Sequence, residues 1–228
     1  MSTQALRPDM PELPRQIRAL PVDKRGFPVP WFVKWIDGEP EFRAMDPEKF
    51  AAAVRERRCW VCGGKLYDEM IFVVGPMCAI NRISSEPPSH RLCARFSARG
   101  CPFLTRPHMH RREDETFSNA KQHSPGMMVE RNPGVTLLWF TRDYKLQRVQ
   151  AMPHLGVAAG YLFNIGKPFE TEWYAHGRPA TRAEVMESID TGLPIFREAN
   201  RKQGIDEAAG EAEIQRRLQE TMRLIPRS

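Results

Sequence analysis

All five cysteines of the 228-residue chain lie between positions 59 and 101, and their spacing suits a metal ion better than disulfides. Cys59 and Cys62 form a CxxC pair followed by two glycines, which let the backbone turn so that both thiolates face one ion. His90 and Cys93 repeat the same two-residue gap. An odd number of cysteines without a secretory signal pattern argues against a disulfide framework. We therefore predict a Zn²⁺ site built from Cys59, Cys62, His90 and Cys93.

The spacing is also compatible with a second choice of fourth ligand. Cys101 could replace His90, which would give a ligand set of cysteines only. An iron–sulfur cluster is a third interpretation, although the spacing matches none of the common cluster motifs. Cys78 is interpreted as a small buried hydrophobic residue and not as a ligand.

The elements around these residues predict an α+β fold with a small antiparallel sheet and C-terminal helices. Asp37-Gly38 predicts a hairpin turn, and Asp46 with Pro47 predicts the start of a helix. Ser89 is the expected N-cap of a helix over 91–99. We expect a Pro-rich extended arm (1–30), a hairpin plus helix (31–57), a zinc module (58–105), a polar loop (106–134), and strands followed by helices (135–228).

Within the last segment, 135–141 predicts a buried strand forming a hairpin with 145–150, followed by strands at 161–165 and 169–174. Thr181 and Glu184 predict a capping box for a helix that ends near Gly192. A last helix over 206–225 carries apolar residues at helical spacing and is expected to pack on the core.

The net charge of +6 is concentrated in the segment that holds the cysteines. Residues 54–112 contain 11 basic and 4 acidic side chains, a surplus of seven, while the rest of the chain is close to neutral. The candidate contact residues for nucleic acid are Arg55, Arg57, Arg58, Arg91, Arg95 and Arg99. Arginine suits phosphate, so the predicted partner is a nucleic acid or an acidic protein. Trp60 is expected to be exposed and to stack on that partner, whereas Trp31, Trp35, Trp139 and Trp173 are expected in the core.

The order of a CxxC knuckle, a strand and a second ligand pair on the first turn of a helix resembles the treble-clef zinc fingers, over residues 59–101 only. The predicted zinc site and the arginines around it make a binding module without enzymatic activity the first hypothesis. Some treble-clef-like proteins are HNH (His-Me) endonucleases, in which a histidine activates water. The alternative hypothesis is therefore a metal-dependent endonuclease in which Cys101 replaces His90 as zinc ligand and His90 acts as general base. Asn81, His108, His110 and Asn119 are then conceivable metal partners.

The strings GPMCAINR and EPPSH, together with the CxxC pair, resemble small uncharacterised proteins of phages and mobile elements in bacteria. This resemblance implies a bacterial or phage setting and does not select an activity. The longest nearly uncharged apolar run, 70–80, is too short for a membrane span. We expect a cytoplasmic protein without membrane contact.

Overall fold

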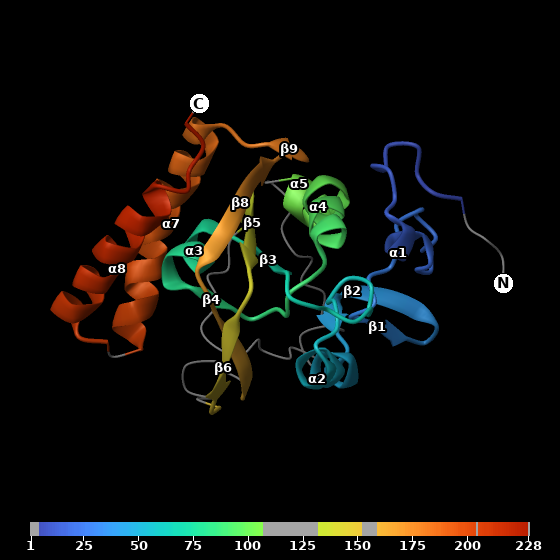
Figure 1. Ribbon diagram of the computed structural model, residues 1–228, viewed down its shortest axis with the longest axis horizontal. Coiled ribbons are helices and arrows are strands. Elements are labelled where there is room, and N and C mark those ends of the chain that lie inside the picture. The colour runs from blue at the N-terminus through green and yellow to red at the C-terminus, as the bar shows by residue number, and fades with distance from the viewer. Residues whose placement is uncertain (1–4, 107–131, 152–158, 204, 228) are drawn as a thin grey trace.

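The structure is a computed structural model that describes residues 5–106, 132–151, 159–203 and 205–227. Figure 1 shows the mixed helix and antiparallel sheet class that the sequence predicts. The elements are α1 (Arg15–Arg18), β1 (Val33–Ile36), β2 (Glu39–Met45), α2 (Pro47–Glu56), β3 (Met70–Val74), α3 (Pro76–Asn81), β4 (Ile83–Ser84), α4 (Arg91–Gly100), α5 (Pro102–Thr105), β5 (Val135–Thr141), β6 (Tyr144–Val149), β7 (Gly160–Ile165), β8 (Pro168–Ala175), β9 (Arg178–Pro179), α7 (Arg182–Lys202) and α8 (Glu207–Met222). The division into five segments stays a prediction.

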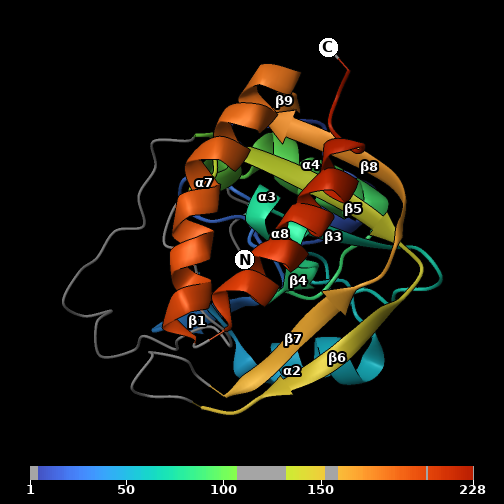
Figure 2. The same cartoon turned by 90° about the vertical axis from the view of Figure 1, so that its left-hand side faces the viewer.

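The central sheet has the strand order β3-β5-β8-β9, and it is covered on both faces. Phe72 and Trp139 belong to the cluster that α3, α7 and α8 complete, while Ile71 and Phe140 belong to a second cluster that Ala94 of α4 completes. Every residue of β5 is buried, as the sequence predicts. In Figure 2 the helices α7 and α8 lie in front of this sheet.

The longest strands form one antiparallel ribbon that bends in its middle. β5 pairs with β8, and the ribbon continues as β6 paired with β7 in a second sheet of order β4-β7-β6. At the bend Gly166 donates its N–H to the Asp143 carbonyl at 3.1 Å, and a Cβ at Gly166 would collide with the Asp143 carboxylate. The predicted hairpin between 135–141 and 145–150 is therefore wrong. Arg142-Asp143 resembles a tight turn in sequence, but the chain only bends there, and both strands pair with the returning half of the ribbon.

Helix α7 begins as predicted and ends later than predicted. Thr181 and Glu184 form the expected capping box. The helix passes through Gly192 and Pro194 and ends at Lys202. Gly192 is buried where a Cβ would lie 3.1 Å from Met77, so this glycine permits close packing on α3 and does not end the helix. Helix α8 follows from its N-cap Asp206 and buries Ile214 in the core, as predicted.

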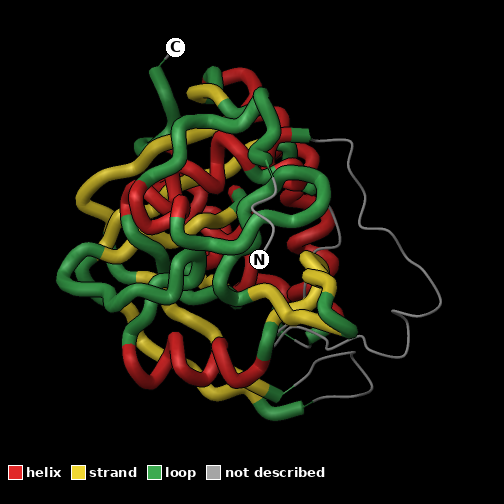
Figure 3. The backbone as a smooth tube through the Cα atoms, turned by 90° about the vertical axis from the view of Figure 1, so that its right-hand side faces the viewer, coloured by secondary structure: helices red, strands yellow, loops and turns green. Residues whose placement is uncertain are grey.

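The N-terminal part of the chain contributes to the core, although the sequence suggests a separate extended arm. Leu13 and Ile17 are buried in a cluster with Val61 and Leu66, next to Cys59 and Cys93. Figure 3 faces this side of the molecule, where long loops run in front of the helices and strands. The prolines keep the arm irregular without preventing its apolar side chains from packing.

The β1–β2 hairpin forms at the predicted turn, with Asp37 and Gly38 both at positive φ (49° and 81°). Trp35 on this hairpin is 42% exposed. Its assignment to the core is therefore wrong, because the hairpin is a two-stranded sheet with little packed on its faces. Trp139 and Trp173 are buried as expected. Within the described residues, no helix is long and apolar enough to cross a membrane.

Candidate metal centre

The CxxC pair sits on a tight turn that follows helix α2. The N-cap Asp46 starts this helix as predicted, and Arg57 in the left-handed conformation ends it. Cys59 then donates its N–H to the carbonyl of Gly64 at 2.7 Å, while Gly63 donates to the carbonyl of Cys59 at 2.8 Å. Two short backbone hydrogen bonds thus close the turn, and both thiols project from it.

Gly63 is required in this turn for two reasons. Its φ of 73° lies in the left-handed region, which side chains disfavour. A Cβ at this position would also lie 2.7 Å from the ring of Trp31. The backbone of the turn is therefore pressed against an aromatic ring, which leaves it little freedom to open.

The second pair stands at the start of helix α4. His90 occupies the N-cap position, and Cys93 lies in the first turn. Ser89, the predicted N-cap, instead pairs with Ile71 of β3 through two backbone hydrogen bonds of 2.8 and 3.0 Å. This pairing fixes the start of α4 on the sheet, so that the ligand pair approaches the knuckle from the sheet side.

The four side chains meet in one cluster. The ligand atoms of Cys59, Cys62, His90 and Cys93 all lie within 4.8 Å of one another. His90 Nδ1 is 3.3 Å from Cys62 Sγ and 4.0 Å from Cys93 Sγ. Tetrahedral zinc, with its usual bond lengths to sulfur and nitrogen, would place these atoms about 3.6 Å apart. The spacing is thus that of a metal site, and the first predicted ligand set is the one that comes together.

The other ring nitrogen of His90 is also engaged. Nε2 lies 3.0 Å from the carbonyl oxygen of Lys65, which can only accept a hydrogen bond, so Nε2 donates. A histidine that ligates a metal commonly donates its second N–H to such a group, which fixes the ring and its tautomer. The backbone N–H of His90 lies 3.4 Å from Cys59 Sγ and stabilises a thiolate there. The supporting contacts therefore match those of a histidine–thiolate metal site.

Without a cation, the cluster brings together one imidazole and three thiols whose protonation states depend on one another. Hydrogen bonds with Cys59 and Cys62 raise the pKa of His90 to about 10. Hydrogen bonds with the same two sulfur atoms raise the pKa of the Cys93 thiol. Three sulfur atoms of which two are fully buried cannot all ionise unless a positive charge joins them. A divalent cation would supply that charge.

The two remaining cysteines lie elsewhere. Cys101 follows the last residue of α4, eight residues after Cys93 and about 12 Å further along the helix axis. It is not part of the cluster, so the ligand set with Cys101 does not form in this fold. Cys78 lies on α3 and is exposed, which corrects its assignment as a buried hydrophobic residue.

Most of the predicted basic stripe on α4 contacts carboxylates of this same chain. Arg91 binds Glu69 and Glu170, with contacts between 2.7 and 2.9 Å. Arg95 forms a bidentate ion pair with Glu172, because Nε reaches Oε2 and the terminal nitrogen reaches Oε1. The pairs with Glu170 and Glu172 join α4 to β8, and the pair with Glu69 joins α4 to the loop before β3. Two of the three arginines of the stripe therefore contribute to packing, which the sequence alone does not reveal because β8 lies far along the chain.

The arginines before the knuckle are partly paired as well. Arg55 and Arg58 both contact the carboxylate of Glu56. Arg57 donates instead to the backbone carbonyl of Tyr67 at 3.1 Å. Arg99, in the last turn of α4, is exposed and has no carboxylate partner in the part of the chain that the structure describes. Contact of these residues with nucleic acid stays a prediction.

The sequence predicts that Trp60 is exposed inside the knuckle, and the structure shows that this prediction is wrong. It is 3% exposed and stacks on Phe32 with ring centroids 4.7 Å apart, and Phe50 of α2 meets it edge to face. The two cysteines turn inward at a tight turn, and the tryptophan between them packs between the hairpin and α2. It is therefore a core residue beside the candidate metal centre and cannot stack on a partner.

The nuclease hypothesis gains no support from the described residues. Both ring nitrogens of His90 are occupied by contacts within the chain, which leaves no basic nitrogen directed toward solvent. Asn81, at the end of α3, lines a pocket that α7 and α8 complete. His108, His110 and Asn119 lie outside the described residues. A general base with a free nitrogen is thus not found where the hypothesis needs one.

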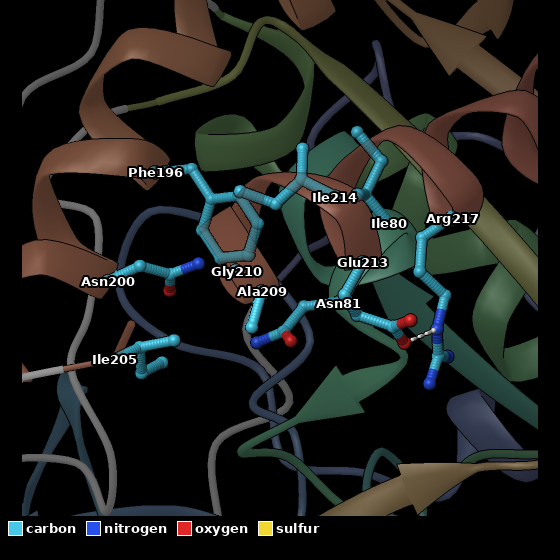
Figure 4. A pocket seen from close by; sticks show the side chains of 10 residues that line it. All are labelled: Ile80, Asn81, Phe196, Asn200, Ile205, Ala209, Gly210, Glu213, Ile214 and Arg217. Atoms are coloured by element: carbon cyan, nitrogen blue, oxygen red, sulfur yellow. Dashed lines mark hydrogen bonds and ion pairs between the residues drawn. The ribbon is translucent and has the colours of Figure 1, made fainter. Parts of the chain in front are cut away.

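That pocket has a volume of about 250 Å³ and is shown in Figure 4. Phe196, Ile214 and Ile80 form its apolar part. Glu213 and Arg217, which line one side, are joined by a dashed line in the figure. Its lining residues come from three helices and the connection between α7 and α8, without a shared motif, so no sequence pattern predicts it. It holds none of the cysteine or histidine groups that could ligate a metal.

No family model, no curated protein and no solved structure matches the chain. The class that the fold and the site define is therefore an α+β chain with a Cys₃His cluster arranged as a metal site. The resemblances to treble-clef fingers and to phage proteins rest on the sequence motifs alone.

Proposed function

We propose that the chain binds one Zn²⁺ through Cys59, Cys62, Cys93 and Nδ1 of His90, and that the ion has a structural role. The supporting observation is that four protein ligand atoms converge within 4.8 Å at the junction of the knuckle, β3 and α4. A compact set of three thiolates and one imidazole favours tetrahedral Zn²⁺ over harder cations. A four-cysteine iron–sulfur centre is disfavoured because Cys101 lies outside the cluster.

The proposed structural role follows from the closed ligand set. A catalytic zinc keeps one position for water or substrate, whereas a structural zinc has four protein ligands. Cys59 and Cys93 are fully buried, so solvent has little access from their side of the site. Structural zinc contributes roughly 10–16 kcal/mol of apparent binding energy at neutral pH, and in this site that energy would stabilise the packing of the knuckle against α4.

Metal analysis of purified protein tests this proposal. We expect one zinc per chain by elemental analysis, and a Co²⁺-substituted form with the intense visible bands of tetrahedral thiolate coordination. Cys62→Ser is expected to lose the metal, because it removes a ligand on the more accessible side. Cys101→Ser and Cys78→Ser are matched controls that should retain it. Full metal retention by Cys62→Ser, or loss in Cys101→Ser, would contradict the ligand assignment.

We further propose that the metal module binds nucleic acid without a catalytic step. The support is the surplus of seven positive charges over residues 54–112, of which Arg57, Lys65 and Arg99 have no carboxylate partner within the described residues. These cations lie at the knuckle and at the far end of α4. Phosphate is a fitting partner because the arginine side chain forms bidentate hydrogen bonds with it.

Binding measured against salt concentration tests the second proposal. Labelled oligonucleotides, single-stranded and duplex, are titrated at several salt concentrations. The logarithm of the affinity should fall linearly with the logarithm of salt, with a slope near −0.9 per contacted phosphate for duplex and about −0.7 for a single strand. Arg99→Gln should reduce that slope, while Gln substitution of Arg142, at the bend between β5 and β6, serves as a basic control elsewhere. Binding of poly-glutamate but not of oligonucleotide would overturn the proposal in favour of an acidic protein partner.

A further inference from the structure

The loop between the knuckle and β3, residues 65–69, is held in place at three points. The imidazole of His90 donates to the carbonyl of Lys65 at 3.0 Å. Arg57 donates to the carbonyl of Tyr67 at 3.1 Å. Arg91 binds the carboxylate of Glu69 with contacts of 2.7 and 2.9 Å. Side chains from α4 and from the end of α2 therefore fix this short loop along its whole length.

Tyr67, at the middle of this loop, points away from the protein. It is 71% exposed, more than any other large hydrophobic side chain in the described ranges. The next residue in this respect is Leu92, 51% exposed, in the first turn of α4 beside the residues that hold the loop. Leu66, next to Tyr67, is buried in a cluster with Leu13 and Ile17 of the N-terminal arm, and this packing also holds the loop in place. A fixed backbone with a projecting aromatic ring needs little ordering when a partner binds.

The charges beside Tyr67 favour a phosphate-bearing partner. Lys65 is exposed and has no ion pair among the residues that the structure describes. The guanidinium of Arg57 reaches the Tyr67 carbonyl and has no carboxylate partner in the same residues. Asp68 is also exposed, and it offsets one of these two positive charges. Glu69 is held by Arg91, which it shares with Glu170. The loop thus presents one aromatic ring beside two cations, Lys65 and Arg57, and one exposed carboxylate, Asp68.

We infer that Tyr67 stacks on an unpaired base of a single-stranded nucleic acid, with Lys65 and Arg57 contacting the adjacent phosphates. This inference rests on the proposed nucleic-acid binding and names the residues that carry it. Single-strand binding proteins combine aromatic platforms with basic side chains in this way. A duplex is a poorer match, because its bases are already stacked and a projecting ring cannot reach their faces. The stacking role expected of Trp60 is assigned here to Tyr67, since Trp60 is buried.

The test compares Tyr67→Ala with Tyr67→Phe in the full-length, zinc-loaded chain. A fluorescein-labelled oligo-dT strand is the probe, its affinity is measured by anisotropy, and zinc content is measured for each variant. Because stacking on one aromatic side chain contributes about 1–3 kcal/mol, Tyr67→Ala should weaken binding about fivefold or more. Tyr67→Phe keeps the ring and should bind as the wild type does. Trp35→Ala is the matched control, since it removes another exposed aromatic ring, from a hairpin that carries Asp37 on its turn and Glu39 at the start of β2.

The outcomes separate this inference from the proposed function. If the wild type binds neither strand form, the proposed nucleic-acid function fails and the inference fails with it. If the wild type binds with the expected salt dependence but Tyr67→Ala binds equally well, the function stands and the role of Tyr67 is wrong. Preference for a duplex of the same sequence over the single strand would also overturn the inference. Equal losses in Tyr67→Ala and Trp35→Ala would mean that the loop has no special role.

Discussion

The Nε2 atom of His90 donates a hydrogen bond to the carbonyl oxygen of Lys65 over 3.0 Å, and this contact decides which ring nitrogen faces the three sulfur atoms. Because Nε2 carries the proton, the neutral ring presents the lone pair of Nδ1 toward Cys62 and Cys93. Lys65 follows directly on the glycines that close the knuckle. One turn therefore provides two candidate ligands and also orients a third.

Removal of the imidazole should remove most of the metal affinity. Loss of a group that merely supports a ligand commonly costs 10–100-fold in metal affinity, so His90→Ala is expected to weaken zinc binding by more than about 100-fold. Competition with a chromophoric chelator measures the affinity. His176→Ala, an exposed histidine on the turn between β8 and β9, is the control and should bind zinc as the wild type does. Unchanged affinity in His90→Ala would show that His90 is not a ligand.

A methyl group at Gly63 should disturb the site more than a methyl group at Gly38. Both glycines have positive φ, 73° and 81°, so alanine costs about 1–2 kcal/mol of backbone strain at either position. At Gly38 a Cβ meets nothing within 4 Å, whereas at Gly63 it would lie 2.7 Å from the Trp31 ring. We expect Gly63→Ala to lower zinc affinity and Gly38→Ala to lower only the free energy of unfolding. Chelator competition and urea unfolding give the two readouts, and equal zinc affinity in both variants would contradict the prediction.

The candidate site could be predicted from the sequence because its geometry is local. Two pairs with a two-residue gap, one on a glycine turn and one at a helix start, leave few ways to arrange four ligands. Helix α4 decides between His90 and Cys101 as the fourth ligand. Because this helix separates Cys93 from Cys101, its length keeps Cys101 away from the cluster. Local signals also predicted the turn at Asp37-Gly38 and the capping box of α7 correctly.

The errors arose where distant segments decide the outcome. The sequence does not reveal that the glutamates of β8 pair with Arg91 and Arg95, although contact of these arginines with nucleic acid stays a prediction. Trp60 resembles an exposed residue of a knuckle until Phe32 and Phe50 enclose it. Gly192 resembles a helix end until α3 packs against it. In each case the residue type is compatible with two environments, and a contact far along the chain selects one of them.

Metal removal should release the N-terminal arm. Ile17 is fully buried in the same cluster as Cys59 and Cys93, so the packing that holds the arm depends on the ligand-bearing elements. Trypsin cleaves after Arg15 and Arg18, which flank this residue. We expect cleavage at these two positions to be slow in the zinc-loaded chain and much faster after treatment with a chelator, with the peptides identified by mass spectrometry. Equal cleavage rates at Arg15 and Arg18 with and without metal would show that the arm docks independently of the site.

Two arginines of α4 should behave differently: Arg91 stabilises the fold, whereas Arg99 can contact a partner. Arg91 bridges Glu69 and Glu170 and stacks on Phe140 at 4.3 Å, and a lysine cannot reproduce this forked geometry. The carboxylates are partly exposed and screened by solvent, so we expect Arg91→Lys to cost about 1 kcal/mol in the free energy of unfolding.

Arg99→Gln removes an exposed side chain at the other end of the same helix and should leave the free energy of unfolding within about 0.5 kcal/mol of the wild type. Urea unfolding of the zinc-loaded variants measures both effects, and oligonucleotide binding is measured in parallel. Arg91→Lys should leave the salt slope of binding unchanged because its guanidinium is held by carboxylates, whereas Arg99→Gln should reduce that slope. A reduced slope in Arg91→Lys at unchanged stability would mean that the ion pairs with β8 open to admit phosphate, and the assignment of Arg91 to packing would then be wrong.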